Sequence, residues 1–193
     1  MDTKELNALK ERAYNIAVEH GFHKDVKPDA YYLGLVMSDM GEVINADRKG
    51  LHANVKGFRI DATFGIDLNE RFEKSIKGSV EDGIADVVIR LLDFAGMKGF
   101  ELYDETDSLS DWHDAFRTFE ESGLPGLLFI LIDGLSDAFD WNELPTYIYD
   151  LIYFFWKWFC KMTGSDYDLW WFVKQKMAYD ELLPKLNGKK EKL

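Results

Sequence analysis

The chain has little cysteine, histidine and positive charge, and each shortage excludes a class of function. Its 193 residues include one cysteine, Cys160, so no intramolecular disulfide can form, which fits a reducing compartment. The four histidines show no spacing typical of a zinc site. Lysine and arginine number 23 against 35 aspartate and glutamate residues, and the net charge of −12 argues against a surface that coats a nucleic-acid polymer.

Long hydrophobic runs, a leader segment and a phosphate-binding glycine loop are also lacking. The N-terminus has no apolar core of a signal peptide, and no Walker-type glycine-rich loop is found. The most apolar run, from Ile148 to Cys160, is too short to cross a bilayer and contains Asp150 and Lys157. We therefore expect a cytoplasmic protein that does not enter a membrane.

Helical periodicity dominates the chain and predicts an all-α protein. Apolar residues recur three and four positions apart over 6–17, 33–44 and 84–95. A hydrophobic content of 47% over this length predicts one domain, 1–193, with a well-developed core. Helices are expected near 6–20, 29–49, 69–76, 79–96, 112–121, 125–139, 145–163 and 166–183.

The chain divides into two halves of different character. Residues 1–103 carry the acidic segments, whereas 112–193 form an aromatic-rich helical half. The polar stretch 104–111 predicts a linker between them. Residues 52–68 predict a long loop with a short extended piece at 58–60, and a connection of this length inside a domain is often functional.

A faint internal repeat relates the two halves. The segment 133–137 stands in its half much as 39–42 stands in the first, and 148–152 echoes 84–88. In the second copy most acidic positions are apolar or aromatic. The pattern predicts either two degenerate helical hairpins or a coincidence among amphipathic helices.

Two acidic clusters at helical spacing are the most informative pattern. Asp39 and Glu42 share one helix face, and Asp82 and Asp86 share another. Two such helices packed face to face would bring four carboxylates together, and Mg²⁺ would relieve their repulsion. The alternatives are two solvated acidic faces and, for Asp82, a capping box with Ser79. Asp86 lies mid-helix among apolar residues, where a carboxylate has no capping role.

Three segments resemble, in family order, the MazG-like nucleotide pyrophosphohydrolases. Residues 38–50 (Ser-Asp-Met-Gly-Glu-Val-Ile-Asn-Ala-Asp-Arg-Lys-Gly) resemble the first family motif, and 80–93 resemble the second. Residues 176–190 resemble the C-terminal segment of phage-type members. The resemblance covers nearly the whole chain. It implies an all-α bundle, usually a homodimer, that hydrolyses a nucleoside triphosphate to the monophosphate and pyrophosphate with Mg²⁺ or Mn²⁺.

The resemblance also implies roles for individual acidic residues. The first, second and fourth family acids fall on Asp39, Glu42 and Asp86, and the third falls on Gly83, which has no side chain. Asp82, one turn before Asp86, is expected to replace the missing acid in part. The expected metal ligands are thus Asp39, Glu42, Asp82 and Asp86, of which Glu42 and Asp86 are also expected to be catalytic.

Further residues are expected to contact the nucleotide. They are Arg48, Lys49 and Lys176, as cations for phosphate, and Tyr179, as a ring that stacks on a base. The alternatives are solvated surface charges for the cations and core packing for the tyrosine. Arg90 is expected to pair with Asp86, one turn before it. Asp180 and Leu183 stand where the family has an asparagine and a basic residue, which weakens the expected grip on a triphosphate.

Two other functions fit the same sequence. A catalytically weakened relative would keep the pocket and bind or sequester a nucleotide, and Gly83 favours this reading. A helical interaction module would instead use the aromatic segment from Trp141 to Phe172 as an interface, because aromatic residues are enriched at interface cores.

Overall fold

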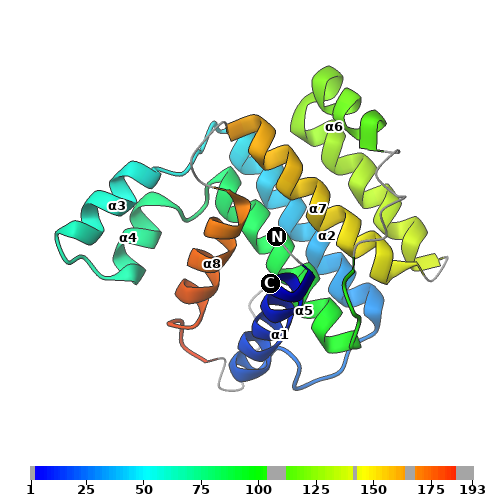
Figure 1. Cartoon of the computed structure of the whole chain (residues 1–193), viewed down its shortest axis with the longest axis horizontal. Coiled ribbons are helices and arrows are strands. Elements are labelled where there is room, and N and C mark those ends of the chain that lie inside the picture. The colour runs from blue at the N-terminus through cyan, green and yellow to red at the C-terminus, as the bar shows by residue number, and fades with distance from the viewer. Residues whose placement is uncertain (1–2, 104–111, 141–142, 164–167, 186–193) are drawn as a thin grey trace.

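The computed structural model describes residues 3–103, 112–140, 143–163 and 168–185, and these form a bundle of helices (Figure 1). The helices are α1 Thr3–His20, α2 Asp29–Arg48, α3 Val55–Thr63, α4 Leu68–Ser75, α5 Val80–Lys98, α6 Trp112–Asp140, α7 Leu144–Thr163 and α8 Leu169–Asp180. No strand occurs within these ranges. The all-α prediction is confirmed.

Helix α5 is the centre of the bundle and packs against α1, α2, α7 and α8 (Figure 1). It begins where the predicted cap lies, since the Ser79 hydroxyl accepts a hydrogen bond from the Asp82 N–H. It ends at Gly99, whose φ of +69° is a left-handed conformation that stops a helix. Its buried apolar face includes Ile84, Val88, Leu91 and Leu92. This face fixes which side of α5 remains for polar residues.

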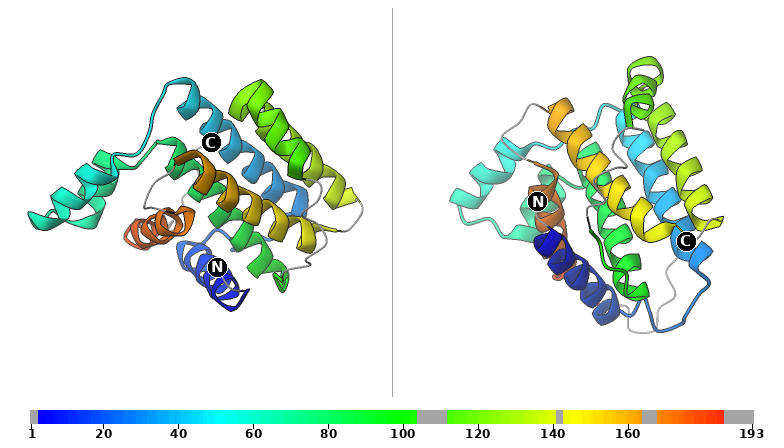
Figure 2. Two further views of the ribbon diagram at one scale, coloured as in Figure 1. Left: turned by 45° about the horizontal axis from the view of Figure 1, so that its top comes forward. Right: turned by 45° about the vertical axis from the view of Figure 1, so that its right-hand side comes forward.

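Residues 55–63 form helix α3, so the predicted extended piece at 58–60 is wrong. The side chain of Asn54 caps α3 by accepting a hydrogen bond from the Gly57 N–H at 2.9 Å. Phe58 is buried and meets the ring of Trp171 edge to face, with centroids 5.5 Å apart. Together α3 and α4 form a hairpin that projects from the bundle (Figure 2).

Helix α6 spans two of the predicted helices and bends between them. Gly123 has φ 66° and ψ −166° inside the element, and Pro125 follows with no N–H to donate. The predicted helices over 145–163 and 166–183 correspond to α7 and α8. The predicted linker at 104–111 lies outside the described residues, and the internal repeat stays a prediction.

Part of α6 bears on the predicted absence of a membrane segment. Arg117–Asp140 is long and apolar enough to cross a bilayer by length and composition, with 33% of its apolar window buried. A core helix of a soluble protein meets the same criterion. The predicted cytoplasmic location therefore stays a prediction.

Candidate functional site

Asp39 of α2 and Asp86 of α5 lie near each other where the two helices pack. Asp39 of α2 is buried, and the Arg90 Nε of α5 donates a 2.5 Å hydrogen bond to Asp39 Oδ2. Burial raises the pKa of Asp39 above its ordinary value; Arg90 opposes the rise, and the nearby carboxylates of Asp86 and Glu42 add to it. Asp39, Glu42 and Asp86 therefore lie within electrostatic reach of one another.

Helix α8 adds a lysine to this cluster. Lys176 Nζ lies 3.1 Å from Asp86 Oδ2 and 3.7 Å from one carboxylate oxygen each of Asp82 and Asp180. Its side chain is only 12% exposed. Burial opposes the lysine's charge, but the three carboxylates outweigh burial and raise the pKa of Lys176. The ammonium is thus held firmly in its charged form.

One ammonium does not neutralise three carboxylates. Burial, only partly offset by Lys176 and reinforced by Asp86, raises the pKa of Asp82 to about 6. The same causes raise the pKa of Asp180 to about 7. Asp82 Oδ2 accepts a 2.8 Å hydrogen bond from the Gly78 N–H, whereas Asp82 Oδ1 is buried without a hydrogen-bond donor. The cluster is therefore short of positive charge.

Asp82 takes part both in the cap of α5 and in the charged cluster, the two roles that the sequence predicts as alternatives. Its backbone N–H is bonded to the Ser79 cap, and its carboxylate bonds back to Gly78, one residue before the position a capping box uses. The same carboxylate faces Lys176. Capping therefore fixes the position of a charged group in the cluster.

Close packing of α2 and α5 explains the glycine at position 83, where the sequence resemblance leads us to expect an acid. A Cβ atom built on Gly83 would lie 2.8 Å from Val43 Cγ2 and 3.5 Å from Val43 Cα. Val43 is fully buried. A side chain at position 83 would therefore have to displace the buried side chain of Val43.

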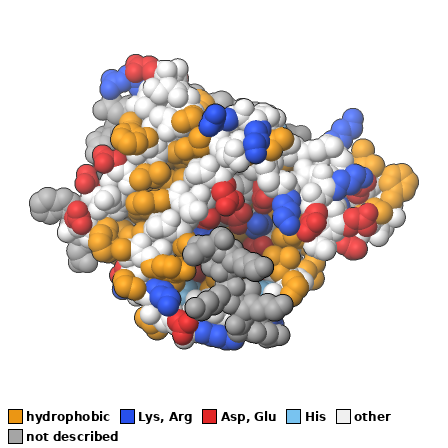
Figure 3. Space-filling view, turned by 180° about the vertical axis from the view of Figure 1, so that it is seen from behind, with side chains coloured by type: hydrophobic (Ala, Val, Ile, Leu, Met, Phe, Trp, Pro, Cys, Tyr) orange, Lys and Arg blue, Asp and Glu red, His pale blue; other side chains and the backbone are white. Residues whose placement is uncertain are grey.

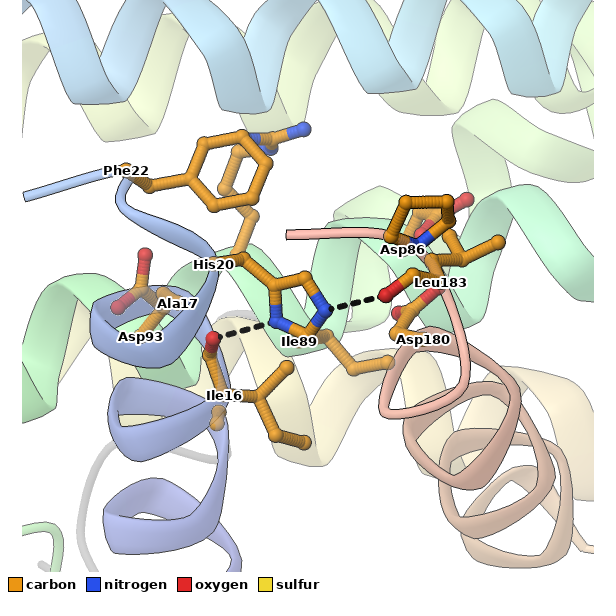
Figure 4. Close-up of a pocket in the computed structure, with 12 residues that line it drawn as sticks. Ile16, Ala17, His20, Phe22, Asp86, Ile89, Asp93, Asp180 and Leu183 are labelled. Carbon is orange, nitrogen blue, oxygen red and sulfur yellow. Dashed lines mark hydrogen bonds between the residues drawn. The ribbon is translucent and has the colours of Figure 1, made fainter. Parts of the chain in front are cut away.

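A pocket of about 290 Å³ adjoins the cluster (Figure 4). Asp86 and Asp180 line one side of it, and Arg90 and Asp93 also border it. The rest is mainly apolar, from Ala13, Ile16, Ala17, Phe22, Ile89, Leu183 and Pro184. A ligand in this pocket would have an apolar wall beside it and the charged cluster at one end.

His20 connects α1 to the segment that follows α8 at the wall of this pocket. Its Nδ1 lies 2.8 Å from the Ile16 carbonyl oxygen and its Nε2 lies 3.1 Å from that of Leu183 (Figure 4). Carbonyl oxygens only accept hydrogen bonds, so both contacts are satisfied only when both ring nitrogens carry a proton. His20 therefore links α1 to the segment that follows α8 at the pocket wall.

Three other residues expected to contact the nucleotide, Arg48, Lys49 and Tyr179, do not join the charged cluster as Lys176 does. Arg48 and Lys49 are exposed at the C-terminal end of α2. Tyr179 is 1% exposed, its ring stacks on Phe72 with centroids 4.4 Å apart, and its hydroxyl donates to Glu73 at 2.8 Å. The tyrosine ring is therefore part of the core, which was the alternative to stacking on a base.

Two relationships in the site were not foreseen. Arg90 donates to Asp39 of the facing helix, a partner that sequence spacing does not show. Asp180, read from the sequence only as a departure from the family pattern, contributes a carboxylate beside Lys176. The signal that was available is the spacing of Lys176 and Asp180, which are four residues apart on α8.

The side chains of the cluster are of the types that bind a divalent cation, but they are not arranged around a single ion. Carboxylate oxygens are the preferred ligands of Mg²⁺, and the unbonded Asp82 Oδ1 is an available donor. Within the described ranges, however, no three His, Cys, Asp or Glu side chains are placed to hold one metal ion. Three of the four expected ligands are instead paired with cations of the chain, Asp39 with Arg90 and both Asp82 and Asp86 with Lys176, whereas Glu42 is exposed.

Figure 3 shows acidic and basic side chains side by side near the middle of one face of the molecule.

No known protein family, curated protein or solved structure matches this chain. The case for a function therefore depends on the motifs and on the geometry of the site.

Proposed function

We propose that the protein binds a nucleoside triphosphate with Mg²⁺ at the cluster around Asp86 and hydrolyses it to the monophosphate and pyrophosphate. The supporting observation is the meeting of α2, α5 and α8 carboxylates with two cations beside a pocket. Asp86 belongs to both the charged cluster and the pocket, since it lies 3.1 Å from Lys176 and lines the pocket. The proposal agrees with the MazG-like motifs of the sequence.

The two cations of the site suit a phosphate chain. The Arg90 guanidinium and the Lys176 ammonium can donate charge-assisted hydrogen bonds to phosphate oxygens. Both now bond to carboxylates, so a bound phosphate would exchange one anionic partner for another. Phosphoryl transfer depends mainly on positioning and charge stabilisation, so no nucleophilic side chain is needed.

One carboxyl group has a suitable pKa to activate water. A general base works best when its pKa lies near the working pH. Asp180, which lines the pocket and whose pKa is raised to about 7, meets this condition. Its carboxylate would accept a proton from water that attacks the α-phosphorus, while pyrophosphate leaves.

A divalent cation would share the same carboxylates. Asp39, Glu42, Asp82 and Asp86 would hold Mg²⁺ or Mn²⁺, and the ion would neutralise charge on the phosphate chain. Because these side chains are paired with Arg90 and Lys176, the ion is expected to arrive with the nucleotide. The phosphate groups would then draw the two cations away from their present partners.

One observation favours nucleotide binding without turnover. The third family acid is absent, and Gly83 is packed too tightly against Val43 to accept it. A site with fewer acidic ligands and a built-in lysine would retain a nucleotide but position its metal poorly. This alternative uses the same pocket and the same residues.

The homodimer and the interaction module also stay proposals. The described part of the aromatic segment 141–172 does not offer the expected interface, because Phe154, Phe155 and Phe159 are buried in the core. Phe129 of α6 is 70% exposed and Ile130 is 38% exposed. Exposed apolar residues on one helix would suit contact with a second copy or with another helical protein. Neither arrangement requires the cluster to be active.

A product assay separates these readings. The purified chain is incubated with each common NTP and dNTP in Mg²⁺, and the products are resolved by ion exchange. The same assay is run on Asp86→Ala and on Asp25→Asn, which changes an exposed carboxylate outside the site. Monophosphate plus pyrophosphate from the wild type and Asp25→Asn, but not from Asp86→Ala, supports the enzyme.

The other outcomes are equally informative. Nucleotide that stays with the wild-type protein through desalting, without product, supports a binding protein. Neither product nor retention would overturn both nucleotide proposals and leave the interaction module.

A further inference from the structure

A second and larger cavity lies away from the Asp86 cluster. It encloses about 680 Å³ between the start of α5, the bend of α6, the end of α7 and α8. Glu81 and Ile84 of α5 line it, on a different side of the helix from Asp82 and Asp86. None of the residues that line this cavity lines the pocket beside Asp86.

One half of the cavity is aromatic. Phe119 and Trp158 meet edge to face with centroids 5.6 Å apart, and Phe159 and Phe172 meet at 5.4 Å. All four line the cavity. Aromatic rings offer an apolar surface whose faces carry partial negative charge, so they bind flat apolar groups and cations.

The other half is polar and is fixed by Glu81. Its carboxylate accepts hydrogen bonds from His52 Nδ1 at 3.1 Å and from the Ala53 N–H at 2.9 Å. These bonds tie the chain between α2 and α3 to the start of α5. Asp47 and Lys56 complete this rim, and neither forms an ion pair with a described residue. Asp47 is half-buried, whereas Lys56 is exposed.

The bend in α6 shapes the cavity on the aromatic side. Gly123 lines the cavity and has φ 66°, a value that side chains on an L-residue disfavour. Leu124 follows it and is buried at the same wall. The bend of the α6 backbone at Gly123 therefore helps to form the cavity.

The balance of charge decides which head group the cavity would take. Two carboxylates, Asp47 and Glu81, lie at the rim. Of the two charged rim residues without an ion pair, Asp47 is less exposed than Lys56. The net charge of −12 also attracts small cations to the protein as a whole. An ammonium near Asp47 would gain an ion pair and the attraction of the aromatic faces.

We propose that this cavity binds an aryl-alkyl amine, with the ring among Phe119, Trp158 and Phe172 and the ammonium beside Asp47. The site is independent of the nucleotide proposal, because the two sites share no lining residue. Either proposal can fail while the other stands.

Three probes of nearly equal size test the proposal on the full chain at pH 7. They are 2-phenylethylamine, which is a cation, 2-phenylethanol, which is neutral, and 3-phenylpropionate, which is an anion. Binding is measured by ligand-observed NMR, because ligands of this size bind with dissociation constants of roughly a millimolar. The amine is expected to bind about fivefold more tightly than the alcohol, and the anion least, because an ion pair with partial exposure contributes about that factor.

Two variants locate the site. Asp47→Asn is expected to lower the affinity for the amine about fivefold and leave the alcohol unchanged. Asp25→Asn, the same change at an exposed carboxylate far from the cavity, is expected to alter neither. Addition of Mg²⁺ with ATP is expected not to displace the amine.

Several results would overturn the proposal. They are equal or tighter binding of the alcohol or the anion, binding of the amine that Asp47→Asn does not weaken, and no detectable binding of any probe. Circular dichroism of each variant confirms that its fold is intact.

Discussion

Lys176 Nζ lies 3.1 Å from Asp86 Oδ2, so the centre of the acidic cluster already contains a cation of the chain itself. The lysine belongs to α8, and the aspartate to α5. The sequence places them 90 positions apart. This contact joins the C-terminal helix to the acidic face of the central helix and sets the charge balance of the candidate site.

Removal of this lysine is expected to destabilise the fold. Lys176→Met leaves Asp82, Asp86 and Asp180 without their shared cation, and loss of one partner of a buried pair costs about 3 kcal/mol. For a chain of this length the melting temperature would fall by roughly 6–12 °C. Lys174→Met is the matched control, because Lys174 pairs with Glu5 at the surface. Its change is expected to stay below about 1 kcal/mol.

The same variant is expected to acquire a response to Mg²⁺. Without Lys176 the carboxylates need another cation, so Mg²⁺ should raise the melting temperature of Lys176→Met and not that of the wild type. At a hundredfold excess over its dissociation constant the ion would add about 2.7 kcal/mol. An equal Mg²⁺ response in both proteins would show that Lys176 does not occupy the cation position.

The raised pKa of Asp180 predicts how stability depends on pH. The folded carboxyl titrates near 7 and the unfolded one near 3.8, so the folded state binds more protons between these values. Stability should therefore fall as pH rises from about 4 to 7. Asp180→Asn removes this loss, which at about 1.4 kcal/mol per pKa unit amounts to about 4 kcal/mol, and is expected to be more stable than the wild type by up to that amount at pH 8, with this advantage absent at pH 3. Urea unfolding at several pH values measures it, and a pH-independent difference would refute the assignment.

Close packing at Gly83 predicts that alanine at this position lowers the stability of the fold, although alanine usually stabilises a helix. Alanine normally stabilises a helix by about 1 kcal/mol relative to glycine. At Gly83 its methyl group would collide with Val43, so Gly83→Ala is expected to destabilise by about 1 kcal/mol net. Gly41→Ala is the control, since Gly41 has open space around its Cα, and it is expected to gain stability. Equal gains at both glycines would show that α2 and α5 are not closely packed there.

The exposed apolar residues of α6 predict self-association. The chain has a mass of 22.4 kDa, and light scattering is expected to give twice this mass at micromolar concentration. Phe129→Ser is expected to shift the species towards the monomer, because among the described side chains of α6 it removes the most exposed large aromatic one. A wild-type monomer at all concentrations would contradict the predicted homodimer.

Much of the fold follows from local patterns. The periodic apolar faces of α1, α2 and α5, and the Ser79 and Gly99 signals at the ends of α5, predict these helices correctly. Helix α3 was missed because it is short and contains Gly57. The polar residues around it predict a loop, although Asn54 supplies the cap of α3. Short helices depend on such caps and on tertiary packing more than on periodicity.

The site is less accessible to sequence reasoning than the fold. Helical spacing places Asp82 and Asp86 on one face, and facing helices explain why Asp39 is near them. Spacing does not reveal that α8 packs across this face and inserts Lys176, because that depends on long-range packing. It also does not reveal that Val43 fills the space beside Gly83.

The most direct test of the nucleotide proposal follows the phosphorus atoms of the substrate. Phosphorus NMR would monitor the preferred nucleoside triphosphate with Mg²⁺ in the presence of wild type, Asp86→Asn and Asp25→Asn. The proposal predicts signals of monophosphate and pyrophosphate with wild type and Asp25→Asn, and at least a hundredfold slower change with Asp86→Asn, on the order of the effect of removing a catalytic group. An unchanged triphosphate, a diphosphate with free phosphate, or equal rates for Asp86→Asn would contradict it.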